Sequence, residues 1–120
     1  AGIGCPVIAS VRGCDFAVLV TEPTPSGFSD LKRILTIVNH FRIPYGVVIN
    51  KWDVNPKLSE AIETWCAESF IGKISYDRAV IDCIVSLKPV LSADSKVVDE
   101  IKEIFEKLKI IIQKHTTETV

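Results

Sequence analysis

The apolar positions of the chain form short continuous runs that alternate with helical stripes. The run from Phe16 to Thr21 is apolar without alternation and rich in β-branched residues, which is typical of a strand covered on both faces. The two prolines between Glu22 and Gly27 interrupt regular structure, and a helix capped near Ser26 or Ser29 is expected to follow. Its apolar stripe, at steps of three and four, consists of Phe28, Leu31, Ile34, Leu35, Val38 and Phe41.

The same alternation continues through the middle of the chain. Gly46 to Asn50 predicts a second buried strand, and Trp52 to Pro56 a loop. Phe70 to Ser75 predicts a third strand. The helix between the second and third strands is expected to bury Leu58, Ile62, Trp65, Cys66 and Ser69.

Helical patterns dominate the last third of the chain. Arg78 to Leu87 predicts a short helix, and Pro89 to Leu91 a brief edge strand. A long helix is expected from about Ser95 to Gln113, with a frayed tail from Thr116. Its apolar stripe consists of Val97, Val98, Ile101, Ile104, Phe105, Leu108, Ile111 and Ile112.

Strands that alternate with amphipathic helices predict an α/β fold, a Rossmann-like parallel sheet flanked by helices. The length of 120 residues fits one domain over residues 1–120, and 48% hydrophobic residues exclude a disordered chain. A net charge of -1 gives no support for nucleic-acid binding. We expect a cytoplasmic protein with no signal peptide, no membrane span and four free cysteines, because the cysteine spacing matches no zinc or redox motif.

Polar residues follow each of the three predicted strands, at the rim where parallel sheets bind ligands. They are Thr21 and Glu22, then Asn50, Lys51 and Asp53, and finally Ser75, Tyr76 and Asp77. The second set forms an N-K-x-D sequence, in which a carboxamide can offer a donor and an acceptor to a purine edge. A structural interpretation is equally open at this point, with Asn50 ending the strand and Asp53 starting a turn.

Five segments occur in an order that resembles the C-terminal half of a MinD/ParA-type P-loop ATPase. They are Ala1 to Ser10, Val20 to Gly27, Asp30 to Arg33, Val48 to Asp53 and Gly72 to Asp77. The likeness is greatest to the branch related to Mrp and the nitrogenase iron protein, which often carries an inserted ferredoxin-like iron–sulfur module. It implies a partial P-loop NTPase domain that begins just after the switch II aspartate. The phosphate-binding loop would belong to an N-terminal half, since no G-x-x-x-x-G-K-[ST] occurs here.

The resemblance also implies roles for individual residues. Asn50 would contact adenine, Lys51 and Asp53 would support the base pocket, and Tyr76 and Asp77 would lie beside the purine. In the loop that contains Tyr76 and Asp77, Ser75 occupies a position where the family usually has proline.

The start of the chain and the end of the first strand receive roles in the same way. Gly2 would lie near the γ-phosphate, and Glu22, Pro23 and Thr24 would face the switch region and a partner. Cys5 resembles a ligand of a 4Fe-4S cluster, which a single thiolate cannot hold.

Our leading hypothesis is therefore the adenine-side half of an ATPase that binds ATP with Mg²⁺. Its partner would be an N-terminal half or a homodimer mate, and the chain alone would not hydrolyse ATP. A GTPase half is the first alternative, because N-K-x-D also reads guanine and residues 92–94 faintly resemble a later base-binding loop. The second is an α/β interaction module without nucleotide, suggested by the apolar run at Ile110 to Ile112.

Overall fold

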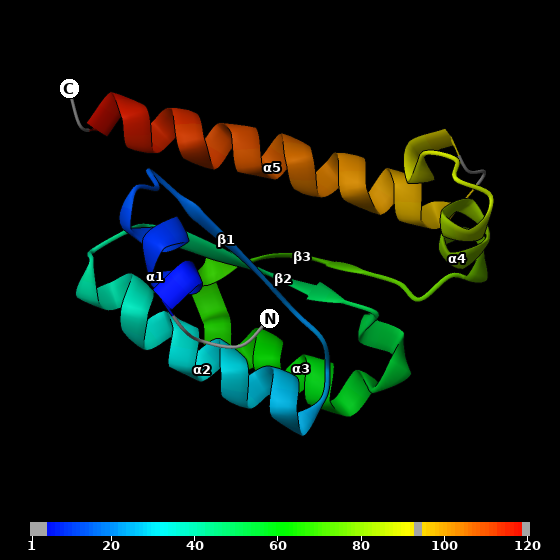
Figure 1. Ribbon diagram of the computed structural model, residues 1–120, viewed down its shortest axis with the longest axis horizontal. Coiled ribbons are helices and arrows are strands. Elements are labelled where there is room, and N and C mark those ends of the chain that lie inside the picture. The colour runs from blue at the N-terminus through cyan, green and yellow to red at the C-terminus, as the bar shows by residue number, and fades with distance from the viewer. Residues whose placement is uncertain (1–4, 93–94, 119–120) are drawn as a thin grey trace.

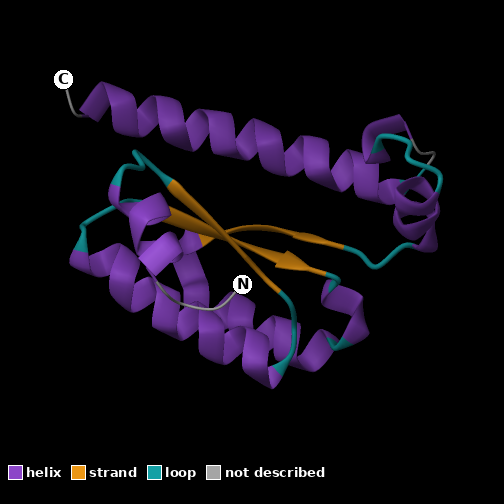
Figure 2. Cartoon of the chain, in the orientation of Figure 1, coloured by secondary structure: helices purple, strands orange, loops and turns teal. Residues whose placement is uncertain are grey.

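The computed structural model describes residues 5–92 and 95–118 and contains a three-stranded parallel sheet (Figure 1, Figure 2). Strands β1 (Ala17–Thr21), β2 (Tyr45–Asn50) and β3 (Phe70–Ile74) lie side by side in this order. The helices are α1 (Cys5–Arg12), α2 (Pro25–His40), α3 (Pro56–Cys66), α4 (Arg78–Val85) and α5 (Lys96–Glu118), with 3-10 turns η1 (Trp52–Val54), η2 (Ala67–Ser69) and η3 (Val90–Ser92). The predicted α/β class with a parallel sheet is confirmed.

Helices α2 and α3 cover one face of the sheet, and α5 runs across the other (Figure 1). The core between the sheet and α2 and α3 is apolar, and its most deeply buried side chains are Val38, Val47, Ile49 and Ile62. Val11 of α1 joins this same cluster, so α1 lies on the α2 side of the sheet. Both crossovers, β1-α2-β2 and β2-α3-β3, therefore run over one face, as right-handed connections require in a sheet with this strand order.

A close approach of α5 to β3 defines the opposite layer. A Cβ atom added to Gly72 would lie 2.6 Å from Cγ1 of Ile104, so the absent side chain lets α5 pack directly on the strand. Val48 is the register partner of Gly72 and is 3% exposed, because α5 covers it as well. The cover of α5 thus extends over β3 and β2.

Strand β1 is not covered on both faces, which contradicts the prediction from its continuous apolar run. Ala17, Leu19 and Thr21 are buried on the α2 side, while Val18 is 40% exposed and Val20 63% exposed. Val20 pairs with Val48 in register, so both side chains belong to the same face. One helix does not span three strands, and the α5 layer ends before β1.

Prolines begin two helices, where the prediction had placed loop residues. Pro25 and Pro56 each occupy the first turn, in which the missing N–H has no intrahelical partner to lose. Thr24 caps α2 with its hydroxyl, which accepts a hydrogen bond from the Gly27 amide at 2.9 Å. The predicted cap at Ser26 or Ser29 is therefore wrong by a few residues.

Three further local predictions differ from the structure. Pro89 to Leu91 is not an edge strand, since Val90–Ser92 forms the 3-10 turn η3. Trp65 is largely exposed and packs edge-on against Phe28 at a centroid distance of 5.3 Å, so it does not belong to the inner face of α3. Helix α5 continues to Glu118, past the predicted end and into the tail expected to fray. No helix in the described part of the chain combines the length and apolar character needed to cross a membrane.

Candidate functional site

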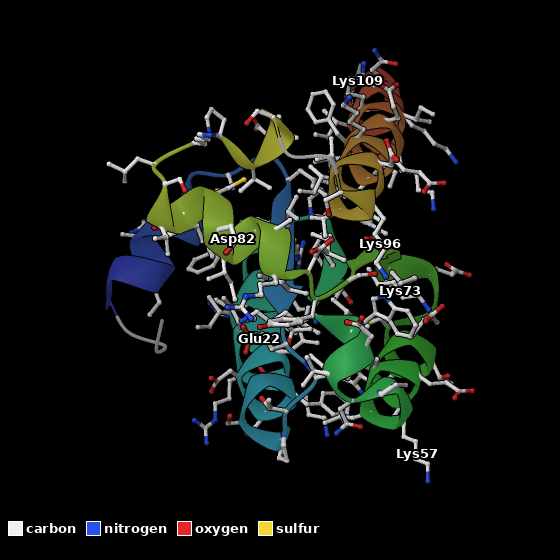
Figure 3. All side chains as sticks on the ribbon, turned by 90° about the vertical axis from the view of Figure 1, so that its right-hand side faces the viewer. Glu22, Lys57, Lys73, Asp82, Lys96 and Lys109 are labelled. Carbon is white, nitrogen blue, oxygen red and sulfur yellow. The ribbon has the colours of Figure 1, made fainter. Side chains whose placement is uncertain are left out.

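A pocket of about 230 Å³ lies at the carboxyl ends of β2 and β3, between α4 and the first turns of α5. Its walls are mainly apolar and come from Ile74, Val80, Ile81, Val90, Val97 and Ile101. Its polar residues are Asn50, Lys51, Ser75, Tyr76 and Asp77, which the sequence had placed at two strand ends. Figure 3 looks onto this end of the molecule, with Asp82 marking α4 and Lys96 the start of α5. The structure thus brings four of the predicted base-site residues to one pocket.

Asn50 ends β2 on the α5 side of the sheet, in register with Ile74. Its side chain is half-buried, and within residues 5–92 and 95–118 no group forms a hydrogen bond with its carboxamide. Lys51 follows in the left-handed conformation, with φ 57° and ψ 44°, which is strained for a residue with a side chain. Its ammonium lies 3.4 Å from a carboxylate oxygen of Glu22, and this ion pair links the end of β2 to the end of β1.

Asp53 does not line the pocket but forms a hydrogen bond to a loop at its edge. Its Oδ1 accepts a hydrogen bond of 2.7 Å from the backbone amide of Tyr76, 23 residues later. This bond joins the loop after β2 to the loop after β3. Tyr76 itself is 46% exposed at the mouth of the pocket.

Ser75 is a buried polar residue at the centre of a hydrogen-bond network. Its hydroxyl donates to Glu100 Oε2 at 2.9 Å and accepts from Trp52 Nε1 at 3.1 Å, and its amide donates to Glu100 Oε1 at 3.3 Å. Every hydrogen-bonding group involved has a partner, which a buried polar cluster requires. This network restrains the loop at the position where the resembling family has proline.

Glu100 and Trp52 are the residues of this corner that the sequence prediction missed. A glutamate in an amphipathic helix is ordinarily expected on the solvated face, yet Glu100 is half-buried and bonded to Ser75. A signal was present, because position 100 lies three residues after Val97 and four before Ile104, on the apolar stripe of α5. A carboxylate on such a stripe needs buried donors, and Ser75 supplies them.

Asp77 uses both carboxylate oxygens within the fold. Oδ1 accepts from the Ala79 amide at 2.9 Å and caps α4, while Oδ2 accepts from the Ser95 hydroxyl at 2.6 Å. The Ser95 hydrogen bond, followed by the Ala79 amide, lowers the pKa of Asp77 below its usual value, and the charge of Lys96 acts in the same direction. Asp77 therefore shapes the pocket wall as a helix cap.

The segment Glu22, Pro23 and Thr24 lies away from this pocket, at the start of α2. Glu22 and Thr24 line a separate open groove of about 410 Å³ that follows β1 and the first turns of α2, whereas Pro23 is buried. Glu22 is labelled in Figure 3 near the ends of the strands. The groove and the pocket are linked by the ion pair between Glu22 and Lys51.

Two predicted residues cannot be placed at a site. Gly2 lies outside the described residues, and Cys5 begins α1 with a side chain that is likewise outside the description. Of the other cysteines, Cys14 is exposed and Cys66 and Cys83 are half-buried. Among the described residues, no group of three or more His, Cys, Asp or Glu side chains is arranged to hold a metal ion.

The chain is similar to two uncharacterized proteins of Methanocaldococcus jannaschii. It is 32% identical to MJ0578 over 108 residues, which cover 90% of the chain and 37% of that protein. It is 35% identical to MJ0579 over 83 residues, which cover 69% of the chain and 28% of that protein. The matched regions therefore span 37% of the length of the first relative and 28% of the second. No protein-family model matches it.

Among solved structures, the fold is similar to that of a protein assigned to plasmid partition, BB_S35 of Borrelia burgdorferi B31, in complex with AMPPNP. The TM-score is 0.68 with 14% sequence identity, over 82% of this chain and 41% of that protein. At this identity the likeness establishes a shared fold. It agrees with the Rossmann-like α/β architecture expected from the sequence.

Proposed function

We propose that the chain is the adenine-binding, C-terminal part of a MinD/ParA-like ATP-binding domain. The observation that carries the proposal is the pocket beside Asn50, where an unengaged carboxamide faces a mainly apolar space at the carboxyl ends of two parallel strands. An apolar slot suits the flat faces of a purine, and a carboxamide can pair with the N6 and N7 edge of adenine. The likeness to an AMPPNP-bound structure supports the same ligand class.

The size of the pocket agrees with a base rather than a whole nucleotide. Its volume of about 230 Å³ is below the ~300–1,000 Å³ typical of pockets for drug-sized ligands. The sugar and phosphates would extend from it, toward a phosphate-binding loop and a magnesium ion held by other residues of the domain. ATP hydrolysis is therefore assigned to the complete domain and not to this chain.

The hydrogen bond of Asp53 favours adenine over guanine. A guanine-reading N-K-x-D site needs the aspartate to accept from the ring N–H groups of the base. Here the Asp53 carboxylate is bonded to the Tyr76 amide and lies outside the pocket lining. The GTPase alternative would require the Asp53 carboxylate to turn into the pocket.

The uncovered face of β1 supports the proposal that further strands complete the sheet. In the described part of the chain, β1 has a neighbouring strand on one side only, and Val18 and Val20 are exposed on its α5 face. Helix α1 lies on the same face as α2, so a right-handed crossover would put a strand that precedes α1 beyond the free edge of β1. That strand and an accompanying helix would form the N-terminal part of the domain.

Nuclear magnetic resonance can test base binding on the 13.3 kDa chain itself. Titration with ATP is expected to shift the Asn50 side-chain amide and the Tyr76 backbone amide, with GTP weaker. Asn50→Ala is expected to weaken ATP binding roughly 5- to 150-fold, the range for one lost bidentate contact of ~1–3 kcal/mol. The control Asn39→Ala changes an exposed residue near the C-terminal end of α2 that does not line the pocket, and it should leave binding intact.

Two results would contradict the proposal. No ligand-dependent shift near Asn50 at millimolar ATP would favour the interaction module without nucleotide. Equal or tighter binding of GTP, with shifts at Asp53, would favour the guanine-binding alternative.

A further inference from the structure

The loop that follows β3 is held by carboxylates from two other elements. The amide and hydroxyl of Ser75 donate to the two oxygens of Glu100 on α5, and the next amide, of Tyr76, donates to Asp53 after β2. Two successive backbone amides are thus bound by charged acceptors, which form stronger hydrogen bonds than neutral ones. The loop after β3 is therefore held in place by hydrogen bonds to α5 and η1.

Glu100 can reach Ser75 because of where α5 lies. The absence of a side chain at Gly72 lets Ile104 settle onto β3, and one turn earlier Glu100 stands over the end of the same strand. Val97 and Ile101, which flank Glu100 along the helix, line the pocket itself. The residue is therefore next to the pocket wall but does not face the pocket.

We propose that Glu100 is a positioning residue for the base pocket and that it acts through Ser75. By fixing both hydrogen-bonding groups of Ser75, it holds residues 75–77 at the distance from Asn50 that a purine ring requires. Trp52 completes the arrangement by donating to the Ser75 hydroxyl, so that the hydroxyl has one orientation. These hydrogen bonds restrain the backbone at Ser75, which would otherwise be free to rotate.

The inference rests on the proposed function, because the pocket has to accept a base for its geometry to matter. The positioning role goes beyond the proposed function, because it belongs to a side chain that would touch no part of the nucleotide. A role limited to stability would change the free energy of unfolding and leave the affinity of the folded protein for the base unchanged. A positioning role changes that affinity.

The test compares Glu100→Ala and Glu100→Gln with the control Glu103→Ala, an exposed glutamate on the same helix. Adenosine is the probe, since it carries the base without phosphates, and binding is followed by amide shifts at temperatures where each variant is fully folded. Glu100→Ala is expected to weaken adenosine binding roughly tenfold, in line with a lost hydrogen bond to a charged group. Glu100→Gln retains one acceptor oxygen and should fall between Glu100→Ala and the wild type, and Glu103→Ala should match the wild type.

Hydrogen exchange of the Ser75 amide provides a second readout that needs no ligand. Faster exchange at residues 75 and 76 in Glu100→Ala, with unchanged exchange in α2, supports the loop restraint. Wild-type affinity for adenosine in this variant overturns the inference, whether or not the exchange of residues 75 and 76 changes. If Glu100→Ala does not fold, Glu100→Gln and Ser75→Ala, which removes the hydroxyl alone, decide the question by the same two measurements.

The two proposals fail in different ways. An absence of adenosine binding in the wild-type protein refutes the proposed function, and with it the assignment of Glu100 to a base pocket. Adenosine binding by the wild type and by all Glu100 variants alike refutes the positioning role and leaves the proposed function standing.

Discussion

The incomplete cover of the α5 face of the sheet, which leaves β1 exposed, can be tested with a matched pair of substitutions. Val20 and Val48 are register partners on neighbouring parallel strands, with side chains on the same face. Val48 is 3% exposed beneath α5, whereas Val20 is 63% exposed. Replacing each with alanine makes the same chemical change in two environments, so much of the loss in strand propensity cancels in the comparison.

The magnitudes follow from burial. Valine to alanine removes two carbons, about 1.6 kcal/mol of transfer free energy at ~0.8 kcal/mol for each buried group. Val48→Ala also leaves a cavity under α5, which raises the expected loss of unfolding free energy to about 2–3 kcal/mol. With 63% of Val20 exposed, roughly a third of the transfer term applies, and the expected loss is about 0.6 kcal/mol.

Urea unfolding monitored by circular dichroism is a suitable assay. With a slope of about 1–3 kcal/mol per molar, Val48→Ala should lower the midpoint by about 1 M or more and Val20→Ala by a few tenths. Equal losses for the two variants would refute the reasoning, since they would mean that the β1 face is covered in solution. A midpoint that rises with protein concentration would then identify a second copy as the cover.

Three further outcomes are expected. Thr24→Ala removes the hydroxyl cap of α2 and should lower the unfolding free energy by about 1 kcal/mol, whereas Thr24→Ser should retain most of it, as measured by urea unfolding. Because hydrogen bonding lowers the pKa of Asp77 in the folded state, the ionised carboxylate stabilises the fold above pH ~4, and this stabilisation is lost as the pH falls through the folded pKa. Asp77→Asn should therefore make the free energy of unfolding less dependent on pH in the acid range. An unchanged pH dependence would contradict the assignment. Burial raises the pKa of Cys66 to about 11, so at pH 8 its thiol should react with iodoacetamide more slowly than exposed Cys14, a difference that unfolding in urea should abolish.

Much of the architecture could be predicted because the relevant signals are local. The 3.6-residue period of α2 and α5 and the apolar runs of β1, β2 and β3 each identify an element from its own residues. Parallel pairing then follows from the alternation of strands and helices, which also places Asn50, Tyr76 and Asp77 at one rim. Helix starts were less predictable, since Pro25 and Pro56 are compatible with both a loop and a first helical turn.

The sequence by itself determined the α/β class, the order of the elements and the set of polar residues at the strand ends. Tertiary structure decided what each of those residues does. Asp53, Asp77 and Asn50 are all polar residues at strand ends, and the sequence does not distinguish their roles. In the structure the carboxylates of Asp53 and Asp77 accept hydrogen bonds that hold loops, whereas the Asn50 side chain remains available to the pocket. Likewise, the exposure of Val20 depends on how far α5 extends across the sheet, and the hydrogen bonds of Glu100 depend on which residues α5 packs against. The physical reason is that periodicity reports which face of an element is apolar, whereas cover and hydrogen-bond partners depend on the other elements that pack against it.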